Sequence, residues 1–225
     1  MSVRKISFAV GEYYHVYNRG NSKQEIFHDR QDYERFVGLL YVCNDNQKLR
    51  IKSILGEKGF FETEKEKPII SIGAYCLMPN HFHLLITPSE DGDVSLFMQK
   101  VSTAYVMYYN KKYSRTGSLF EGKFKSKHAS SDEYLKYLFS YIHLNPVGLI
   151  DPHWKKIGIQ DKNKALEYLS LYHYSSYLDY SLSERKEGKI LNRSAFPDYF
   201  PEKSLFNKEI FDWISYVPTL QGLAL

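Results

Sequence analysis

Two spacings of hydrophobic residues run through the chain, one typical of strands and one typical of helices. Residues 13–19 are rich in strand-favouring side chains and end at the turn cluster Gly20-Asn21-Ser22. Two further β-rich runs, 69–77 and 81–87, are separated only by Met78-Pro79-Asn80, a connection short enough to predict an antiparallel pair. A fourth strand is predicted over residues 119–127.

Helical spacing of apolar residues predicts three helices between these strands and after them. The first covers residues 29–41, and the second begins at Asp93. The third covers residues 132–145, with Ser130, Ser131 and Asp132 available to cap its start and Pro146 to stop it. The order of elements is therefore βαββαβ plus one helix, the split βαβ pattern of an α+β fold.

A chain of 225 residues supports one sizeable core with an appendage. We place the main domain at residues 1–150 and an extension at 151–225, where the signals weaken to two short predicted helices, 162–169 and 208–215. The charge-rich stretch between Gly56 and Pro68 is predicted to be an exposed loop or hairpin tip.

The amino-acid composition excludes only a few classes of function. A net charge of +4 fits a polyanionic partner, and 20 tyrosines and 14 phenylalanines among the basic residues fit a surface that stacks single-stranded bases, although an aromatic-rich core gives the same count. Cys43 and Cys76 belong to no Cys-x-x-Cys pair, which argues against a disulfide framework or a zinc module. Because no run of eighteen apolar residues occurs, we expect a cytoplasmic protein that does not contact membranes.

The tripeptide His81-Phe82-His83 is the most informative candidate for chemistry. Side chains two apart on a strand share a face and lie roughly 6 to 7 Å apart, so both imidazoles can bind one metal ion while Phe82 faces the core. Such a pair also arises by chance, and the site needs a third ligand.

The helix predicted over residues 132–145 supplies a candidate third ligand. Leu135, Leu138, Phe139 and Ile142 form its apolar face, and Tyr134, Tyr141 and Asn145 lie on a neighbouring stripe. Tyr141 and Asn145 are one turn apart, so an amide oxygen and a phenol can point at the same ion.

A tyrosine hydroxyl has a pKa near 10 and is a poor nucleophile unless the phenolate is stabilised or its target is polarised. A metal ion on a scissile phosphate would do the second, which makes Tyr141 a candidate nucleophile for a covalent phosphotyrosine. An ordinary tyrosine at a helix edge is the alternative, and Tyr137, one turn earlier, is the reserve candidate.

Basic residues suggest a path for a phosphate backbone. Lys123, Lys125 and Lys127 alternate along the predicted fourth strand, so they would share a face and follow a phosphate backbone, or else protect an exposed sheet edge from aggregation. Arg19, Lys111, Lys112 and Arg115 are expected to widen this patch.

Four ordered segments carry a resemblance to a known family. They are residues 14–20 (YHVYNRG), 75–85 (YCLMPNHFHLL), 120–126 (FEGKFKS) and 141–147 (YIHLNPV), with 174–177 (YSSY) as a weaker fifth. Together they resemble the REP-associated tyrosine transposases, single-tyrosine HUH endonucleases related to the smallest bacterial insertion-sequence transposases.

This resemblance implies a ferredoxin-like catalytic domain with an antiparallel sheet, cleavage dependent on Mg²⁺ or Mn²⁺, a 5′-phosphotyrosine intermediate and recognition of hairpin DNA. By position, His81, His83 and Asn145 match the family's metal ligands and Tyr141 matches its nucleophile. The chain departs from the pattern after Pro146, where a basic residue common in the family is missing, and its final 45 residues match nothing in the family. The extension would then be the part that selects a hairpin.

Two other functions remain open at the level of sequence. One is a regulator that binds hairpin DNA without cutting it, and the other is a metal-dependent phosphodiesterase or RNA nuclease in which water attacks. The resemblance favours a protein that acts as a monomer, and a homodimer that exchanges its tyrosine helices is the alternative.

Overall fold

The fold is an antiparallel sheet with helices on both faces. In the computed structural model, residues 8–47, 59–90, 92–181, 184–200 and 203–215 are described. The strands are β1 (Tyr14–Arg19), β2 (Ile70–Met78), β3 (His81–Pro88) and β4 (Lys125–His128), and they lie in the order β2-β3-β1-β4. The predicted α+β architecture and its antiparallel sheet are confirmed.

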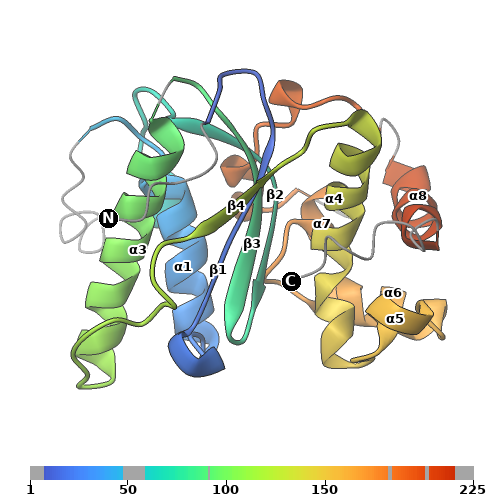
Figure 1. The fold of residues 1–225 in the computed structure, drawn as a ribbon, viewed down its shortest axis with the longest axis horizontal. Helices are drawn as coiled ribbons and strands as arrows, with labels where there is room; N and C mark the ends of the chain where they lie inside the picture. Colours follow the sequence, from blue (N-terminus) through green and yellow to red (C-terminus); the bar gives the residue numbers. More distant parts are fainter. Residues whose placement is uncertain (1–7, 48–58, 91, 182–183, 201–202, 216–225) are drawn as a thin grey trace.

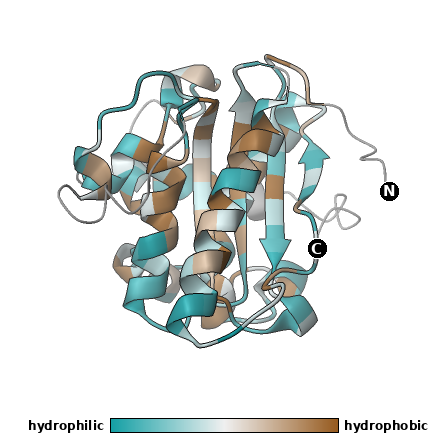
Figure 2. Ribbon diagram, turned by 90° about the vertical axis from the view of Figure 1, so that its left-hand side faces the viewer, coloured by the Kyte–Doolittle hydropathy of each residue, from teal (hydrophilic) through white to brown (hydrophobic). Residues whose placement is uncertain are grey.

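Helices α1 (Arg30–Val42) and α3 (Asp93–Lys112) cover one face of the sheet, and α4 (Asp132–Leu144) covers the other (Figure 1). The first face is a conventional apolar core in which Val16, Phe82 and Leu84 are completely buried against the two helices. Seen from that side, α1 and α3 carry both hydrophobic and hydrophilic segments, as expected for helices with one face on a sheet (Figure 2).

The extension packs on α4 and leaves little of it exposed. Its helices are α5 (Trp154–Ile157), α6 (Lys162–Leu171), α7 (Tyr177–Ser181) and α8 (Lys203–Ser215), and with α4 they form a second apolar core (Figure 1). Helix α8 begins at Lys203, five residues before the predicted start. Residues 151–200 and 203–215, where described, therefore share a core with the helix that carries Tyr141, and the last ten residues of the extension lie outside the described part.

Residues 172–177, which include the weak fifth motif, line the outer edge of β2. The amide N–H of Leu77 donates to the carbonyl of Tyr174, and the N–H of Ser176 donates to the carbonyl of Tyr75, each over 2.9 Å. An uncovered edge strand invites association with other strands, so this segment protects the sheet as well as joining two helices.

The fourth strand is much shorter than predicted. Gly122 has a φ of +94° and its N–H donates to the carbonyl of Phe120, so a tight turn interrupts the run before Lys125. The prediction that Lys123 alternates on one strand with Lys125 and Lys127 is therefore wrong.

The loop predicted between Gly56 and Pro68 is only partly exposed. From residue 59 on it is described, and it contains a 3₁₀ turn, Phe60–Glu62, in which Phe61 is buried with its ring 5.3 Å from that of Tyr41. Residues 56–58 of the predicted loop lie outside the described part. Aromatic side chains thus anchor a segment whose charge predicted exposure.

Candidate active site

The register of β1 and β3 brings residues from two motifs to one face of the sheet. Tyr17 is paired with His83, and Arg19 with His81, so these four side chains project toward α4. The sequence predicted that the two histidines turn away from the core of Phe82, and they do. They are nevertheless not on an open surface, because α4 and the extension cover that face and His83 is 0% exposed.

Hydrogen bonds orient both imidazole rings. His83 Nδ1 lies 2.8 Å from Nε2 of His15, and His81 Nδ1 lies 2.6 Å from the side-chain oxygen of Asn80. With hydrogen on each Nδ1, donated to these partners, the Nε2 lone pairs stay available for a cation. Nε2 of His83 is buried and has no hydrogen-bond partner within the described part of the chain.

The histidines are held in their neutral form. Burial, reinforced by the charges of Lys155 and Arg19, lowers the pKa of His81 to about 4. Burial likewise lowers the pKa of His15 to about 3, with Lys127 and Lys155 adding to the effect, and it lowers the pKa of His83 well below its ordinary value. Near neutral pH these rings are therefore unprotonated, as metal ligands must be.

Helix α4 presents Tyr141 and Asn145 to this face. Ser131 caps the helix by accepting a hydrogen bond from the N–H of Tyr134 over 3.2 Å. Tyr141 is 4% exposed, and the centroid of its ring lies 5.5 Å from that of His83 and 6.0 Å from that of His15. The contact between Tyr141 and His83 that the sequence predicts is therefore present.

Asn145 begins a 3₁₀ turn, Asn145–Leu149, directly after α4. Its amide nitrogen donates to the carbonyl of Tyr141 over 3.1 Å, which turns Oδ1 the other way. That oxygen accepts a hydrogen bond from Lys155 over 3.2 Å, and the same ammonium group donates to the hydroxyl of Tyr141 over 2.9 Å.

Lys155 was not among the predicted site residues. It belongs to α5, and no spacing in the sequence indicates that its side chain reaches back to Tyr141. The one related feature of the sequence is the absence, after Pro146, of a basic residue that is common in the family.

The donor set fits a divalent cation if Asn145 takes part. Within the described ranges, no group of three or more His, Cys, Asp or Glu side chains is arranged to hold a metal ion. His15 cannot be the third ligand through Nε2, since that atom is engaged by His83. Two neutral imidazoles with an amide oxygen suit Mn²⁺, and also Mg²⁺ when water or phosphate oxygens complete the shell.

Lys125 and Lys127 lie beside the histidines. Lys125 is paired with Tyr17 and Lys127 with His15, so both project from the face that carries His83. Arg19 lies at the same edge of the sheet, where its guanidinium binds Glu121 through two hydrogen bonds of 3.1 Å. These residues remain predicted DNA contacts, as does Lys123 in the turn before β4.

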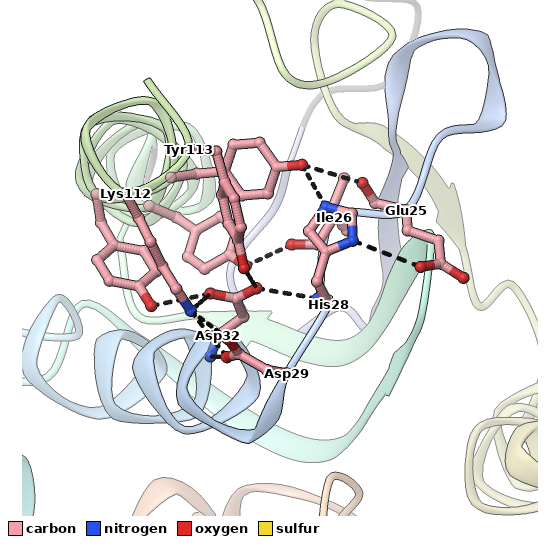
Figure 3. Close-up of polar contacts among 10 residues, drawn as sticks. Glu25, Ile26, His28, Asp29, Asp32, Lys112 and Tyr113 are labelled. Atoms are coloured by element: carbon pink, nitrogen blue, oxygen red, sulfur yellow. Dashed lines mark hydrogen bonds and ion pairs between the residues drawn. The ribbon is translucent and has the colours of Figure 1, made fainter. Parts of the chain in front are cut away.

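The other three predicted DNA contacts lie elsewhere. Lys111, Lys112 and Arg115 are at the end of α3, on the opposite face of the sheet, so they do not widen the surface of Lys125 and Lys127 as predicted. Lys112 is also engaged in ion pairs with Asp29 and with the buried Asp32, each over 2.7 Å (Figure 3). The charge of these residues can be read from the sequence, but the face on which α3 packs cannot.

Tyr137, the reserve nucleophile, lies next to Tyr141 with a distance of 5.7 Å between ring centroids. Burial, followed by the neighbouring tyrosines, raises its pKa above the ordinary value, which disfavours the phenolate. Tyr141 is the tyrosine of α4 whose ring contacts His83 and His15.

Comparison with known proteins places this arrangement in a family. A family model described as "Transposase IS200 like" matches residues 10–145, which include both histidines, Tyr141 and Asn145. The chain belongs to the IS200-like transposases. The predicted relation to small insertion-sequence transposases is thereby confirmed.

Other comparisons add little to this assignment. No curated protein matches the chain. A solved structure described as a REP-associated tyrosine transposase bound to a REP hairpin is similar with a TM-score of 0.48 and 13% identity, over 80% of this chain and 84% of that one. In the described part of this IS200-like transposase, no helix has the length and hydrophobicity needed to cross a membrane.

Proposed function

We propose that this IS200-like transposase cuts and rejoins single-stranded DNA next to hairpins, with Tyr141 as the covalent nucleophile and His81, His83 and Asn145 as ligands of Mg²⁺ or Mn²⁺. One observation carries the proposal: the Tyr141 ring contacts His83, an imidazole that burial keeps neutral and whose buried Nε2 has no hydrogen-bond partner in the described residues. A nucleophile and a metal-competent pair of imidazoles thus meet on one face of the sheet.

In the proposed cleavage, Oη of Tyr141 attacks the scissile phosphorus and forms an O–P bond. The bond from phosphorus to the 3′ oxygen breaks, and that oxygen leaves with the electron pair and takes a proton from water, while the phenolic proton passes to solvent. The product is a 5′-phosphotyrosine, and attack by a 3′ hydroxyl on it reverses the step and rejoins a strand. A bound metal ion would polarise the scissile phosphate.

The chain's own residues position the reactants. The fixed turn between Tyr141 and Asn145 keeps the nucleophile beside the proposed metal ligands, and Lys155 holds the Tyr141 hydroxyl. Lys125 and Lys127 extend along β4 from this point and would guide the phosphate backbone of a single strand. We further propose that the extension, residues 151–225, helps to select the hairpin, since its described helices lie against the helix that carries the nucleophile.

The test is a covalent-trapping experiment. Labelled single-stranded hairpin oligonucleotides from the DNA flanking the gene are incubated with the protein and Mn²⁺ and separated on a denaturing gel, with Tyr141→Phe and Tyr137→Phe in parallel. We expect label to migrate with wild-type protein and Tyr137→Phe, and none to migrate with Tyr141→Phe.

The two alternative functions predict different results in this experiment. Cleavage without an adduct would support water as the nucleophile and overturn the covalent mechanism. Binding without cleavage under Mg²⁺ or Mn²⁺ would support a regulator that only holds hairpins.

A further inference from the structure

Lys155 has an unusual pair of partners for a lysine. Its ammonium group donates to the Tyr141 hydroxyl and to Oδ1 of Asn145, and it lies 4.6 Å from the centroid of the Tyr141 ring. Among the described residues, no carboxylate lies within ion-pair distance of it. Its charge is therefore not neutralised by a neighbour and is directed into the candidate site.

The same charge acts on the histidines. Lys155 contributes to the low pKa of His81, His83 and His15, after burial in each case. A positive charge that disfavours a proton on these rings also disfavours a divalent cation bound to them, because both effects are Coulombic repulsion.

We propose that Lys155 competes with the metal ion for Oδ1 of Asn145, so that metal binding releases the ammonium from Asn145 and leaves it on the Tyr141 hydroxyl alone. This inference rests on the proposed function, since it assigns Asn145 and Tyr141 the roles given above. Lys155 is then a positioning residue. Its hydrogen bond to the Tyr141 hydroxyl persists, whereas its hydrogen bond to Oδ1 of Asn145 is lost when metal binds.

The competition follows from the geometry of Asn145. Its amide nitrogen is fixed to the carbonyl of Tyr141, so Oδ1 is the only side-chain atom that it can offer to a cation. That oxygen has two lone pairs, but an ammonium and a divalent ion on the same oxygen would lie a few ångströms apart and repel each other strongly. One of the two cations must therefore give way.

The arrangement links metal binding to the readiness of the nucleophile. With Lys155 on both groups, the Tyr141 hydroxyl and the amide are held together as a unit. Once Asn145 binds metal, the ammonium would keep its hydrogen bond to the hydroxyl and hold Tyr141 in the position that it has in the structure. Lys155 therefore weakens the affinity of the site for metal, and it keeps the Tyr141 side chain in a fixed position.

Mn²⁺ binding measures this competition without DNA. Free Mn²⁺ is followed by electron paramagnetic resonance at neutral pH in titrations of the full chain, comparing wild type with Lys155→Met, Lys155→Arg and Lys156→Met. Lys156 is the matched control, because it is exposed on the same short helix and its side chain has no recorded contact in the described part of the chain.

We expect Lys155→Met to bind Mn²⁺ about tenfold more tightly, a difference of about 1.4 kcal/mol, with Lys155→Arg and Lys156→Met close to wild type. In single-turnover assays at saturating Mn²⁺, Lys155→Met should form adduct more slowly with little change in the DNA concentration needed. Equal or weaker Mn²⁺ binding by Lys155→Met, with Lys155→Arg confirming that the fold is intact, would overturn the competition.

The two proposals fail in different ways. A wild-type protein that forms no adduct, together with tighter Mn²⁺ binding by Lys155→Met, would sink the covalent mechanism and still support the competition. An adduct that depends on Tyr141, together with unchanged Mn²⁺ binding by Lys155→Met, would support the covalent mechanism and overturn the competition.

Discussion

His15 and His83 are 68 residues apart in the chain, and Nε2 of the first lies 2.8 Å from Nδ1 of the second. Their ring planes are inclined at 27°, with centroids 5.0 Å apart, and both residues are buried. If His83 offers Nε2 to a metal ion, its hydrogen must be on Nδ1, and His15 is the acceptor that keeps it there. A buried imidazole thus takes the orienting role that a carboxylate or a carbonyl usually has.

Removing this acceptor should weaken metal binding. We expect His15→Leu to lower the Mn²⁺ affinity about 10-fold to 100-fold, and His15→Gln, which places an amide oxygen near the position of Nε2, to restore most of it. Mn²⁺ titration at neutral pH measures the effect, and thermal unfolding shows whether the fold survives. Equal affinities for wild type and a folded His15→Leu would show that His15 only packs.

The buried Asp32 should be a major stabilising residue. Its carboxylate accepts hydrogen bonds from Lys112 and Tyr113 over 2.7 Å, and from Tyr108 and the N–H of His28 over 2.9 Å (Figure 3). We expect Asp32→Asn to lower the free energy of unfolding by about 3 kcal/mol, measured by urea denaturation near neutral pH. Asp29→Asn keeps the helix cap and loses only an exposed ion pair, so it should cost under about 1 kcal/mol.

The contribution of Asp32 to the free energy of unfolding should decrease in acid. Burial raises the pKa of this carboxyl, but the hydrogen bonds from Lys112, Tyr113, His28 and Tyr108 outweigh it and hold the pKa below its ordinary 3.8. The stabilisation is therefore fully present above that value and is lost as the pH falls through the lower folded value. The difference between wild type and Asp32→Asn should be constant from pH 7 to about 5 and shrink in stronger acid; a difference that grows in acid would contradict this assignment.

Ser176 should stabilise the second apolar core. Its hydroxyl lies 2.8 Å from Nε2 of His143 and accepts from the N–H of Tyr75 over 2.9 Å, all out of contact with solvent. Ser176→Ala leaves two buried polar groups without this partner, and we expect a loss of about 2 to 3 kcal/mol in the free energy of unfolding. Ser181→Ala is the control, since that hydroxyl donates to the carbonyl of Tyr177 in its own helix, and it should change stability by less than about 0.5 kcal/mol.

Gly20 should tolerate no side chain. A Cβ at this position would lie 2.2 Å from the carbonyl oxygen of Gln24 and 2.9 Å from Cγ2 of Ile26, and the N–H of Gly20 donates to the carbonyl of Asn80 beside His81. We expect Gly20→Ala to cost more than about 2 kcal/mol by chemical denaturation. Gly117→Ala, where only the φ of +84° opposes a side chain, should cost about 1 kcal/mol; similar losses for both would show that the backbone at residues 20–24 adjusts.

The sequence by itself determined the features that depend on local spacing. Alternation along a strand puts His81 and His83 on one face, and a helical turn puts Tyr141 beside Asn145, whatever else the chain does. The order of strands and helices followed from the same periodicities, and the motifs were enough to indicate the family. The interrupted fourth strand escaped this reasoning because one glycine at positive φ breaks a run that is otherwise favourable for a strand.

Only the tertiary structure decided which residues meet across these elements. Periodicity gives the face of a strand or helix but not its partner, so neither the bond between His15 and His83 nor the reach of Lys155 to Tyr141 was visible in advance. For the same reason the charge of Lys112 suggested DNA, whereas the packing of α3 on α1 places it against Asp32. Contacts between residues far apart in sequence are set by how whole elements pack. The packing of these elements brings the imidazole of His15 and the ammonium group of Lys155 to the site.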